Sequence, residues 1–216
     1  MPGDDAGVQG SARPGTDGRA ARADRTRRAV VEAHLGLIRA GELKPTGAQI
    51  ASRAGVSVRS LWGNFNDLES LFAASGAELA RKQQAMIATI DPELDLRERV
   101  DAYCRQHARV LEFVAPFARS SEIRAPYSRE LQRNRSRYLR ETTTEIEAVF
   151  GRELTGLDAD SRRELVQALG IATTWPTWVS LRDVLKLPVP EATSVMIRMV
   201  GALLASASDA CGVVSP

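Results

Sequence analysis

The sequence predicts an all-α protein of about nine helices, and three observations support this. Apolar residues recur at helical spacing along most of the chain after Thr26, as at Val30, Ala33, Leu37 and Ile38. Capping residues precede these runs, and glycine or proline follows them, which marks where helices begin and end. No alternating pattern typical of a strand is longer than four residues.

The first part of the chain is expected to hold a tail and three helices. Residues 1–24 are rich in glycine and arginine, lack apolar periodicity and are expected to form a disordered basic tail. A T-x-x-Q capping box at Thr46 and a serine cap at Ser57 mark two short helices. Residues 25–70 are expected to form one domain. Its expected helices cover 26–40, 47–54 and 57–65.

Residues 71–216 are expected to form a second, larger helical domain. Asn66, with glutamate three residues later, marks its first helix, and prolines open or close several others. Pro176 is expected to kink a long helix between two tryptophans, either shaping a pocket mouth or following the curvature of the bundle. The expected helices cover 67–90, 94–114, 117–123, 127–150, 158–185 and 190–210.

The composition excludes several classes of function. The 216 residues are 44% hydrophobic, enough for a sizeable core, but include two histidines and two cysteines only. His34, His107, Cys104 and Cys211 form neither a zinc-ligand pattern nor a disulfide framework, and no catalytic set is evident. We therefore expect no enzyme, no metal and no cofactor. With no run of 18 apolar residues and no secretory signal, we expect a cytoplasmic protein without a membrane segment.

Basic residues gather at the front of the chain. Residues 1–65 hold 10 Lys and Arg against 6 acidic residues, whereas residues 66–216 hold 19 against 21. The whole-chain charge of +2 therefore combines a basic front with a slightly acidic remainder. Such a front predicts contact with a polyanion, and the alternative is a solvated basic segment without a partner.

The two short helices over 47–65 have the features of a helix-turn-helix. Gly55 supplies the sharp turn between them, and Ala51 is small enough for a close crossing. Ile50 and Leu61 are placed to share a core. In this motif the second helix lies in the major groove of DNA, so its exposed positions are candidates for contacting bases.

These residues resemble the tetracycline-repressor-like (TetR) family of bacterial regulators. Residues 46–65 read TGAQIASRAGVSVRSLWGNF, similar to the family pattern T-x-x-x-I-A-x-x-A-G-V-S-x-x-T-L-Y-x-H-F, and DLESL follows over 67–71. The resemblance implies an N-terminal helix-turn-helix DNA-binding domain and a C-terminal helical domain for ligand binding and dimerisation. It further implies a homodimer that binds a pseudo-palindromic double-stranded DNA operator and is released by a small-molecule effector. The expected function is a ligand-responsive transcriptional repressor.

The resemblance places ten candidate DNA-binding residues. The first positions of the second short helix would face base edges, and Arg59 among them can bond guanine bidentately. Trp62 stands at the family's tyrosine position, where packing is the alternative to a phosphate contact. The arginines before and at the start of the first helix would contact flanking phosphates or the minor groove, or stay solvated. The ten residues are Arg25, Arg27, Arg28, Thr46, Val58, Arg59, Ser60, Trp62, Gly63 and Asn64.

Three residues depart from the family pattern. Gly63 lies inside the second short helix, Leu68 stands where a lysine is usual, and Trp62 replaces a tyrosine. They indicate fewer contacts to the DNA backbone than usual. Gly63 and Leu68 are also the only support for another interpretation, a helical enzyme or binding module that kept the motif as a relic.

The second domain is expected to bind an effector, itself largely apolar or aromatic, and to form the dimer. For each effector candidate, packing in the core is the alternative role. An activator or architectural protein without an effector would instead have a filled core. The effector candidates are Tyr103, His107, Leu111, Phe117, Tyr138, Thr142, Trp175 and Trp178. The last two helices resemble the family's dimer bundle, with interface candidates Ile171, Leu181, Leu185, Val195, Met199, Leu203 and Leu204.

Overall fold

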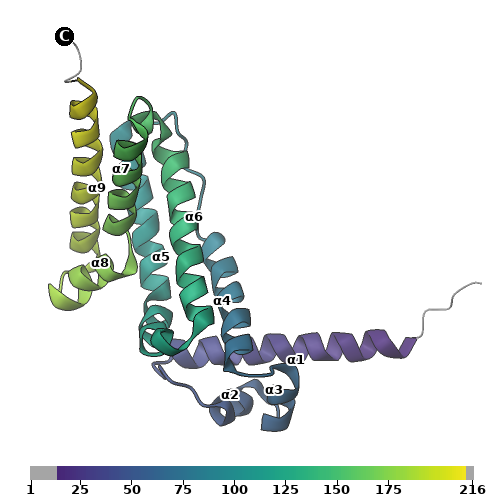
Figure 1. Cartoon of the computed structure of the whole chain (residues 1–216). Coiled ribbons are helices and arrows are strands. Elements are labelled where there is room, and N and C mark those ends of the chain that lie inside the picture. The colour runs from purple at the N-terminus through teal and green to yellow at the C-terminus, as the bar shows by residue number, and fades with distance from the viewer. Residues whose placement is uncertain (1–13, 213–216) are drawn as a thin grey trace, which may run out of the picture.

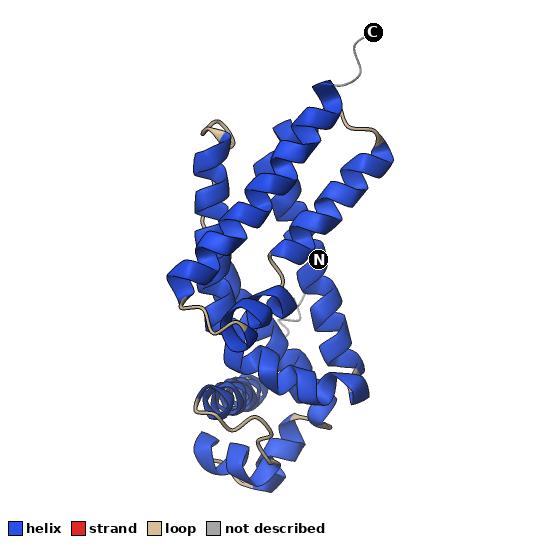
Figure 2. Cartoon of the chain, turned by 90° about the vertical axis from the view of Figure 1, so that its left-hand side faces the viewer, coloured by secondary structure: helices blue, strands red, loops and turns tan. Residues whose placement is uncertain are grey.

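The computed structural model describes residues 14–212, and the side chains of residues 18–207. Over this part of the chain the regular structure is entirely helical, which confirms the predicted fold class (Figure 1, Figure 2). A 3₁₀ turn, η1 (Ala125–Tyr127), precedes α6, and a π-helical turn, η2 (Ser180–Val184), follows α8. The nine α-helices described are α1 (Pro14–Arg39), α2 (Gly47–Ala54), α3 (Val58–Asn64), α4 (Leu68–Gln84), α5 (Leu96–Arg124), α6 (Arg129–Leu154), α7 (Ala159–Ala172), α8 (Trp175–Val179) and α9 (Val189–Gly212).

Helices α1, α2 and α3 form a small unit at one end of the bundle built by α4 to α9 (Figure 1). Ile50 of α2, Leu61 of α3 and Leu71 of α4 are completely buried in its core. Phe117 reaches this same core from α5. The small unit and the bundle are therefore joined by shared apolar packing, and α4 belongs to both.

Local capping fixes the ends of the two short helices. Thr46 forms the predicted capping box, in which the backbone N–H of Gln49 donates to Thr46 Oγ1 at 3.2 Å. Gly55 ends α2 with a φ of 68°, a left-handed conformation that favours glycine. Ser57 Oγ accepts from the backbone N–H of Ser60 at 3.0 Å and starts α3. The turn between α2 and α3 is thus determined by residues within it.

The first helix is longer than the sequence predicts. It begins at Pro14 and not at Thr26, so residues 14–24, expected to be disordered, are helical. Arg19 to Ala23 are all arginine or alanine, which are good helix formers, and extending a helix requires no new nucleation. Residues 18–25 are exposed and project away from the rest of the molecule (Figure 1). Residues 1–13 of the predicted tail lie outside the described residues.

The long helix predicted over 158–185 is interrupted. Helix α7 ends at Ala172, and Thr174 adopts an extended conformation that caps α8. Pro176 lies in the first turn of α8, so it starts a helix instead of kinking one. Backbone N–H groups in the first turn of a helix have no acceptor within the helix. Proline, which lacks this N–H, therefore removes no hydrogen bond there. At α5 the opposite occurs: the two predicted pieces form one helix with Pro116 inside it.

Helix α9 packs lengthwise against α5 and α7 (Figure 1). Its buried stripe consists of Ala192, Met196, Val200 and Leu204, which recur every four residues. The segment Val189–Ala207, with a mean hydropathy of 1.2, is long and apolar enough to cross a membrane. A core helix of a bundle has the same length and composition, so this is weak evidence for a membrane span.

Candidate functional site

Helix α3 presents a continuous exposed surface at the end of the molecule. Val58 is 44% exposed and Trp62 is 37% exposed, and Arg59 and Gly63 are exposed beside them. Leu61 of the same helix is completely buried and anchors it. Arg59 forms no ion pair with any described residue, so its guanidinium is free to bind a ligand.

Arg27 fixes the end of α3 to α1. Its guanidinium lies 4.4 Å from the centre of the Phe65 ring and donates to the backbone carbonyl of Asn64. The Asn64 side chain donates in turn to the carbonyl of Ser60 at 2.8 Å. The sequence predicts that Arg27 and Asn64 contact DNA, and in this structure both also make contacts within the chain that hold the end of α3. Arg25 and Arg28 are exposed and lack ion pairs among the described residues.

Trp62 packs over the start of α2. A β-carbon added at Gly47 would lie 2.7 Å from Trp62 Cζ2, which is closer than atoms can approach. Thr46, predicted to contact phosphate, uses its Oγ1 for the capping box and also donates to Gln49 Oε1 at 2.8 Å. Gly63 has open space around it. The departures at positions 62 and 63 therefore fit the structure without strain.

Helix α4 connects the small unit to the bundle by polar contacts on both sides. His34 Nδ1 of α1 is 2.8 Å from Ser75 Oγ of α4, in a buried setting. Burial and then the charge of Arg124 lower the pKa of His34 to about 4. Lys82 Nζ pairs with Glu32 of α1 at 2.7 Å. Helix α4 is therefore held to α1 by a buried hydrogen bond and by an ion pair.

Helix α4 also contacts the start of α6. Glu69 Oε2 accepts from the backbone N–H of Glu130 at 3.0 Å. Gly76 approaches α6 so closely that an added β-carbon would lie 2.4 Å from Asn134 Nδ2. The two helices are thus in direct contact before they reach the cavity described next, because none of these four residues lines it.

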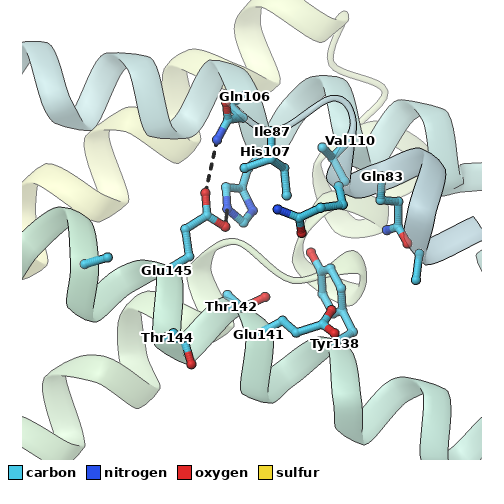
Figure 3. A pocket seen from close by; sticks show the side chains of 13 residues that line it. Gln83, Ile87, Gln106, His107, Val110, Tyr138, Glu141, Thr142, Thr144 and Glu145 are labelled. Atoms are coloured by element: carbon cyan, nitrogen blue, oxygen red, sulfur yellow. Dashed lines mark hydrogen bonds and ion pairs between the residues drawn. The ribbon is translucent and has the colours of Figure 1, made fainter. Parts of the chain in front are cut away.

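A cavity of about 340 Å³ lies between the C-terminal end of α4, the middle of α5 and the middle of α6 (Figure 3). This volume is within the range of small-molecule sites, about 300–1,000 Å³. The wall is mixed, with polar and apolar side chains. It is formed by Ala80, Gln83, Gln84, Ile87, Gln106, His107, Val110, Tyr138, Glu141, Thr142, Thr144, Glu145 and Ala148.

Glu145 is the centre of a hydrogen-bond network in the cavity wall. It accepts from Gln106 Nε2 at 3.1 Å and contacts His107 Nε2 at 3.2 Å (Figure 3). Burial raises the pKa of Glu145, but the hydrogen bonds from His107 and Gln106 outweigh burial and lower it overall. Gln106 Oε1 accepts from the backbone N–H of Ala88 at 2.8 Å, which fixes the network to the segment after α4.

Two buried polar atoms of the wall have no hydrogen-bond partner within the described part of the chain. They are Nδ1 of His107 and the hydroxyl of Tyr138. Burial raises the pKa of Tyr138 to about 12, so this side chain remains a neutral phenol. Figure 3 shows the His107 and Tyr138 side chains directed into the same space. Unpaired buried polar atoms are unusual, and here they border an opening that can admit a ligand.

Three of the predicted effector residues line this cavity and five lie elsewhere. His107, Tyr138 and Thr142 are in its wall. Tyr103 and Leu111 are completely buried in the core of the bundle, and Phe117 belongs to the core of the small unit. The indole of Trp178 donates to Glu112 and that of Trp175 donates to Glu122, each at 2.8 Å.

Most of the polar wall does not follow from the sequence-based predictions. Glu141 and Glu145, like the glutamines at the end of α4, are not among the predicted effector residues. The residues at 138, 141, 142 and 145 have i, i+3, i+4, i+7 spacing, so they share one face of α6. This spacing in the sequence indicates that the four polar residues lie together, and it could have identified them as one wall of a site.

The predicted interface residues fall into two groups. Leu181 and Leu204 are 5% and 0% exposed and pack inside the chain's own core, so they are not open to a partner. The other five are at least partly accessible. Ile171, Met199 and Leu203 line a shallow apolar depression between α7 and α9, and Ile171 is 63% exposed. Val195 is half-buried and Leu185 is exposed.

Comparison of sequences finds neither a matching protein-family model nor a matching curated protein. Comparison of structures finds the crystal structure of a transcriptional regulator from Rhodococcus sp. Rha1, with a TM-score of 0.63. The match covers 85% of this chain and 96% of that chain, at 19% sequence identity. At this identity the likeness shows the fold. The chain therefore shares the all-helical fold of that transcriptional regulator.

Proposed function

We propose that this chain is a cytoplasmic, ligand-responsive transcriptional repressor of the TetR type that binds a pseudo-palindromic operator as a homodimer. The observation that carries the proposal is the exposed surface of α3, with Arg59 unpaired among the described residues and the helix anchored by Leu61 and Arg27. The fold shared with a known transcriptional regulator supports it. The basic front of the chain supplies the charge needed to approach DNA.

The cavity supports a regulator with an effector over an architectural protein with a filled core. A void of about 340 Å³ with unpaired polar atoms in its wall lies at the C-terminal end of α4. The other end of α4 packs into the core that holds α3. A ligand that binds better to one position of α4 therefore shifts the position of the recognition helices, by no more than its differential affinity for the two states.

The direct test is binding to DNA from the regulated promoter region. Purified full-length protein is expected to bind such DNA, with an affinity that falls linearly with salt on logarithmic axes. Unrelated DNA of equal length gives the non-specific reference. Binding that is equal for both DNAs, or that does not depend on salt, would contradict the proposal.

Substitution of Arg59 tests the base contact. Arg59→Ala is expected to lose about 1–3 kcal/mol of discrimination between the operator and operators altered at one base pair, because the bidentate bond to guanine is removed. Arg109→Ala is the matched control, since Arg109 is an exposed arginine on α5 far from α3. Affinities are measured by fluorescence anisotropy on a set of single-base variants. Unchanged discrimination in Arg59→Ala would remove Arg59 from this role.

A further inference from the structure

We propose that the cavity between α4, α5 and α6 binds a small organic cation with an N–H donor, such as a protonated amine. The cation proposal rests on the proposed function in one respect, because it takes the cavity as the effector site. It replaces the largely apolar effector expected from the sequence. Three features of the cavity wall support it: its charge, its unpaired acceptor and its apolar portion.

Two carboxylates line the cavity: Glu145 contacts His107, whereas Glu141 has no cationic partner among the described residues. Glu141 and Glu145 line it, and no lysine or arginine does. Glu141 forms no hydrogen bond or ion pair with any described residue. Glu145 has two donors within the protein, Gln106 and His107, and retains free lone pairs. An anionic ligand would meet two carboxylates here, whereas a cation would be attracted by both.

The end of α4 adds to this negative potential. Gln83 and Gln84 of its last turn are in the cavity wall, so the negative end of the helix dipole lies beside the cavity. Lys82, in the same turn, pairs with Glu32 and with Glu78. Its charge is therefore compensated outside the cavity, and the field inside remains favourable for a cation.

The hydrogen bonds of His107 specify a donor on the ligand. An ionised Glu145 can only accept, so His107 Nε2 donates to it. In the neutral ring the remaining nitrogen, Nδ1, is then an acceptor, and it is buried without a partner among the described residues. A ligand N–H would satisfy it. The hydroxyl of Tyr138, which lies next to Thr142 in the same wall, can accept a second N–H of the same group.

The rest of the wall fits a short hydrocarbon body. Ala80, Ile87, Val110 and Ala148 provide apolar surface next to the polar groups. The volume of about 340 Å³ is at the lower end of the range for small-molecule sites. The ligand is therefore a compact ammonium compound with one short aryl or alkyl group.

Calorimetric titration of the full chain without DNA tests the charge. The probes are benzylammonium, cyclohexylammonium and 2-phenylethylammonium, with N-acetyl-2-phenylethylamine and 3-phenylpropionate as neutral and anionic counterparts of the last. We expect saturable binding of ammonium probes at one site per chain, and affinities for the neutral and anionic counterparts that are lower by about tenfold or more. Absence of saturable binding for all three ammonium probes, or equal binding of 3-phenylpropionate, would overturn the proposal.

Two variants locate the site. Glu141→Gln is expected to weaken ammonium binding about tenfold without affecting the fold, because Glu141 has no partner among the described residues. Glu147→Gln is the matched control, since Glu147 lies on the same helix but pairs with Arg162 of α7, outside the cavity. Circular dichroism verifies folding of both. Equal weakening in both variants, or none in Glu141→Gln, would contradict the assignment of the cation to this cavity.

The test of the cation site can fail independently of the test of the proposed function. Ammonium binding is measured without DNA, and DNA binding of the ligand-free protein is measured on its own. Binding of DNA without binding of any ammonium probe would overturn the cation site and leave the DNA-binding function standing. Ammonium binding that never releases DNA would support the cation site and contradict its role as the effector site.

Discussion

Trp62 on α3 and Gly47 at the start of α2 depend on each other. Trp62 stands where the family that the sequence resembles has a tyrosine. Its larger indole occupies the space where a β-carbon of residue 47 would be. It keeps 37% of its surface exposed, so its body packs while its edge remains accessible. A pair of residues on different helices thereby sets how α3 is presented.

Two glycine substitutions test this dependence. Gly47→Ala is expected to destabilise the protein by about 1–3 kcal/mol, because the added carbon would lie 2.7 Å from Trp62 Cζ2. Gly63→Ala is expected to stabilise it by about 0.5–1 kcal/mol, because nothing lies within 4 Å and alanine favours the helix. Urea unfolding gives both free energies.

The double variant Gly47→Ala/Trp62→Phe is the control for the pair. The smaller ring is expected to recover part of the lost stability, which gives a favourable coupling free energy in the double-mutant cycle. Strict additivity of the two changes would show that the indole is not the obstacle. Stabilisation by Gly47→Ala alone would contradict the close contact.

The roles of single residues were partly readable from the sequence. Thr46, Ser57 and Gly55 act through their own backbone neighbours, so their capping and turn roles follow from spacing alone. Arg27 is different, because its partners Phe65 and Asn64 are distant in the sequence. Its intramolecular role becomes visible only when α1 and α3 are placed side by side.

At the scale of elements, the contact between α1 and α4 contains a histidine that resists protonation. The pKa of His34 is lowered from 6.5 to about 4, so the unfolded chain binds more protons than the folded chain between these values. The free energy of unfolding is therefore expected to fall as the pH drops from 6.5 to about 4, by up to about 3 kcal/mol from this group. Urea unfolding at a series of pH values measures this.

The variant His34→Gln serves as the control. Glutamine can keep a hydrogen bond to Ser75 but does not titrate in this range, so the variant is expected to lose this part of the pH dependence. Its stability near pH 7 reports the cost of replacing the ring. An unchanged pH dependence in His34→Gln would show that another group is responsible.

The predicted helices were closer to the structure than the predicted effector cavity. Amphipathic spacing identifies a helix but not its rotation relative to its neighbours. On α5 the predicted effector face carries Tyr103, His107 and Leu111, whereas the cavity faces Gln106, His107 and Val110. Successive residues of a helix point in directions that differ by about 100°, so a shift of one residue changes which face is described. The packing of α6 and α9 on α5 determines which face of α5 meets the cavity.

The arginines on the projecting part of α1 are expected to contact DNA phosphates. Arg25 and Arg28 are exposed and form no ion pairs among the described residues. Replacing both by alanine is expected to weaken binding similarly for all operator variants and to reduce the salt slope by about 0.9 for each phosphate that is no longer neutralised. Replacement by lysine, which keeps the charge, is expected to retain most of the slope. A salt slope equal to that of the unmodified protein after alanine substitution would show that α1 does not contact DNA.

At the scale of the whole molecule, a mainly apolar depression between α7 and α9 has no covering element among the described residues. Only 28% of the apolar segment Val189–Ala207 is buried within the chain. Ile171, Met199 and Leu203 meet in one depression between the two helices. A second copy of the chain, related by a two-fold axis, would bury this face and place two α3 helices on one operator.

Charged substitutions in this depression are expected to abolish the dimer. Ile171→Arg and Leu203→Arg each place a large charged side chain in the mainly apolar part of the proposed interface, so light scattering after gel filtration should show monomers that stay folded. Val184→Arg is the matched control, because Val184 is 71% exposed and lies outside the depression. The monomeric variants should also lose most of their operator affinity, since two half-sites are no longer bound together. Dimers that persist in both variants would place the interface on another face of the molecule. The two α3 helices would then be spaced differently from what this interface implies.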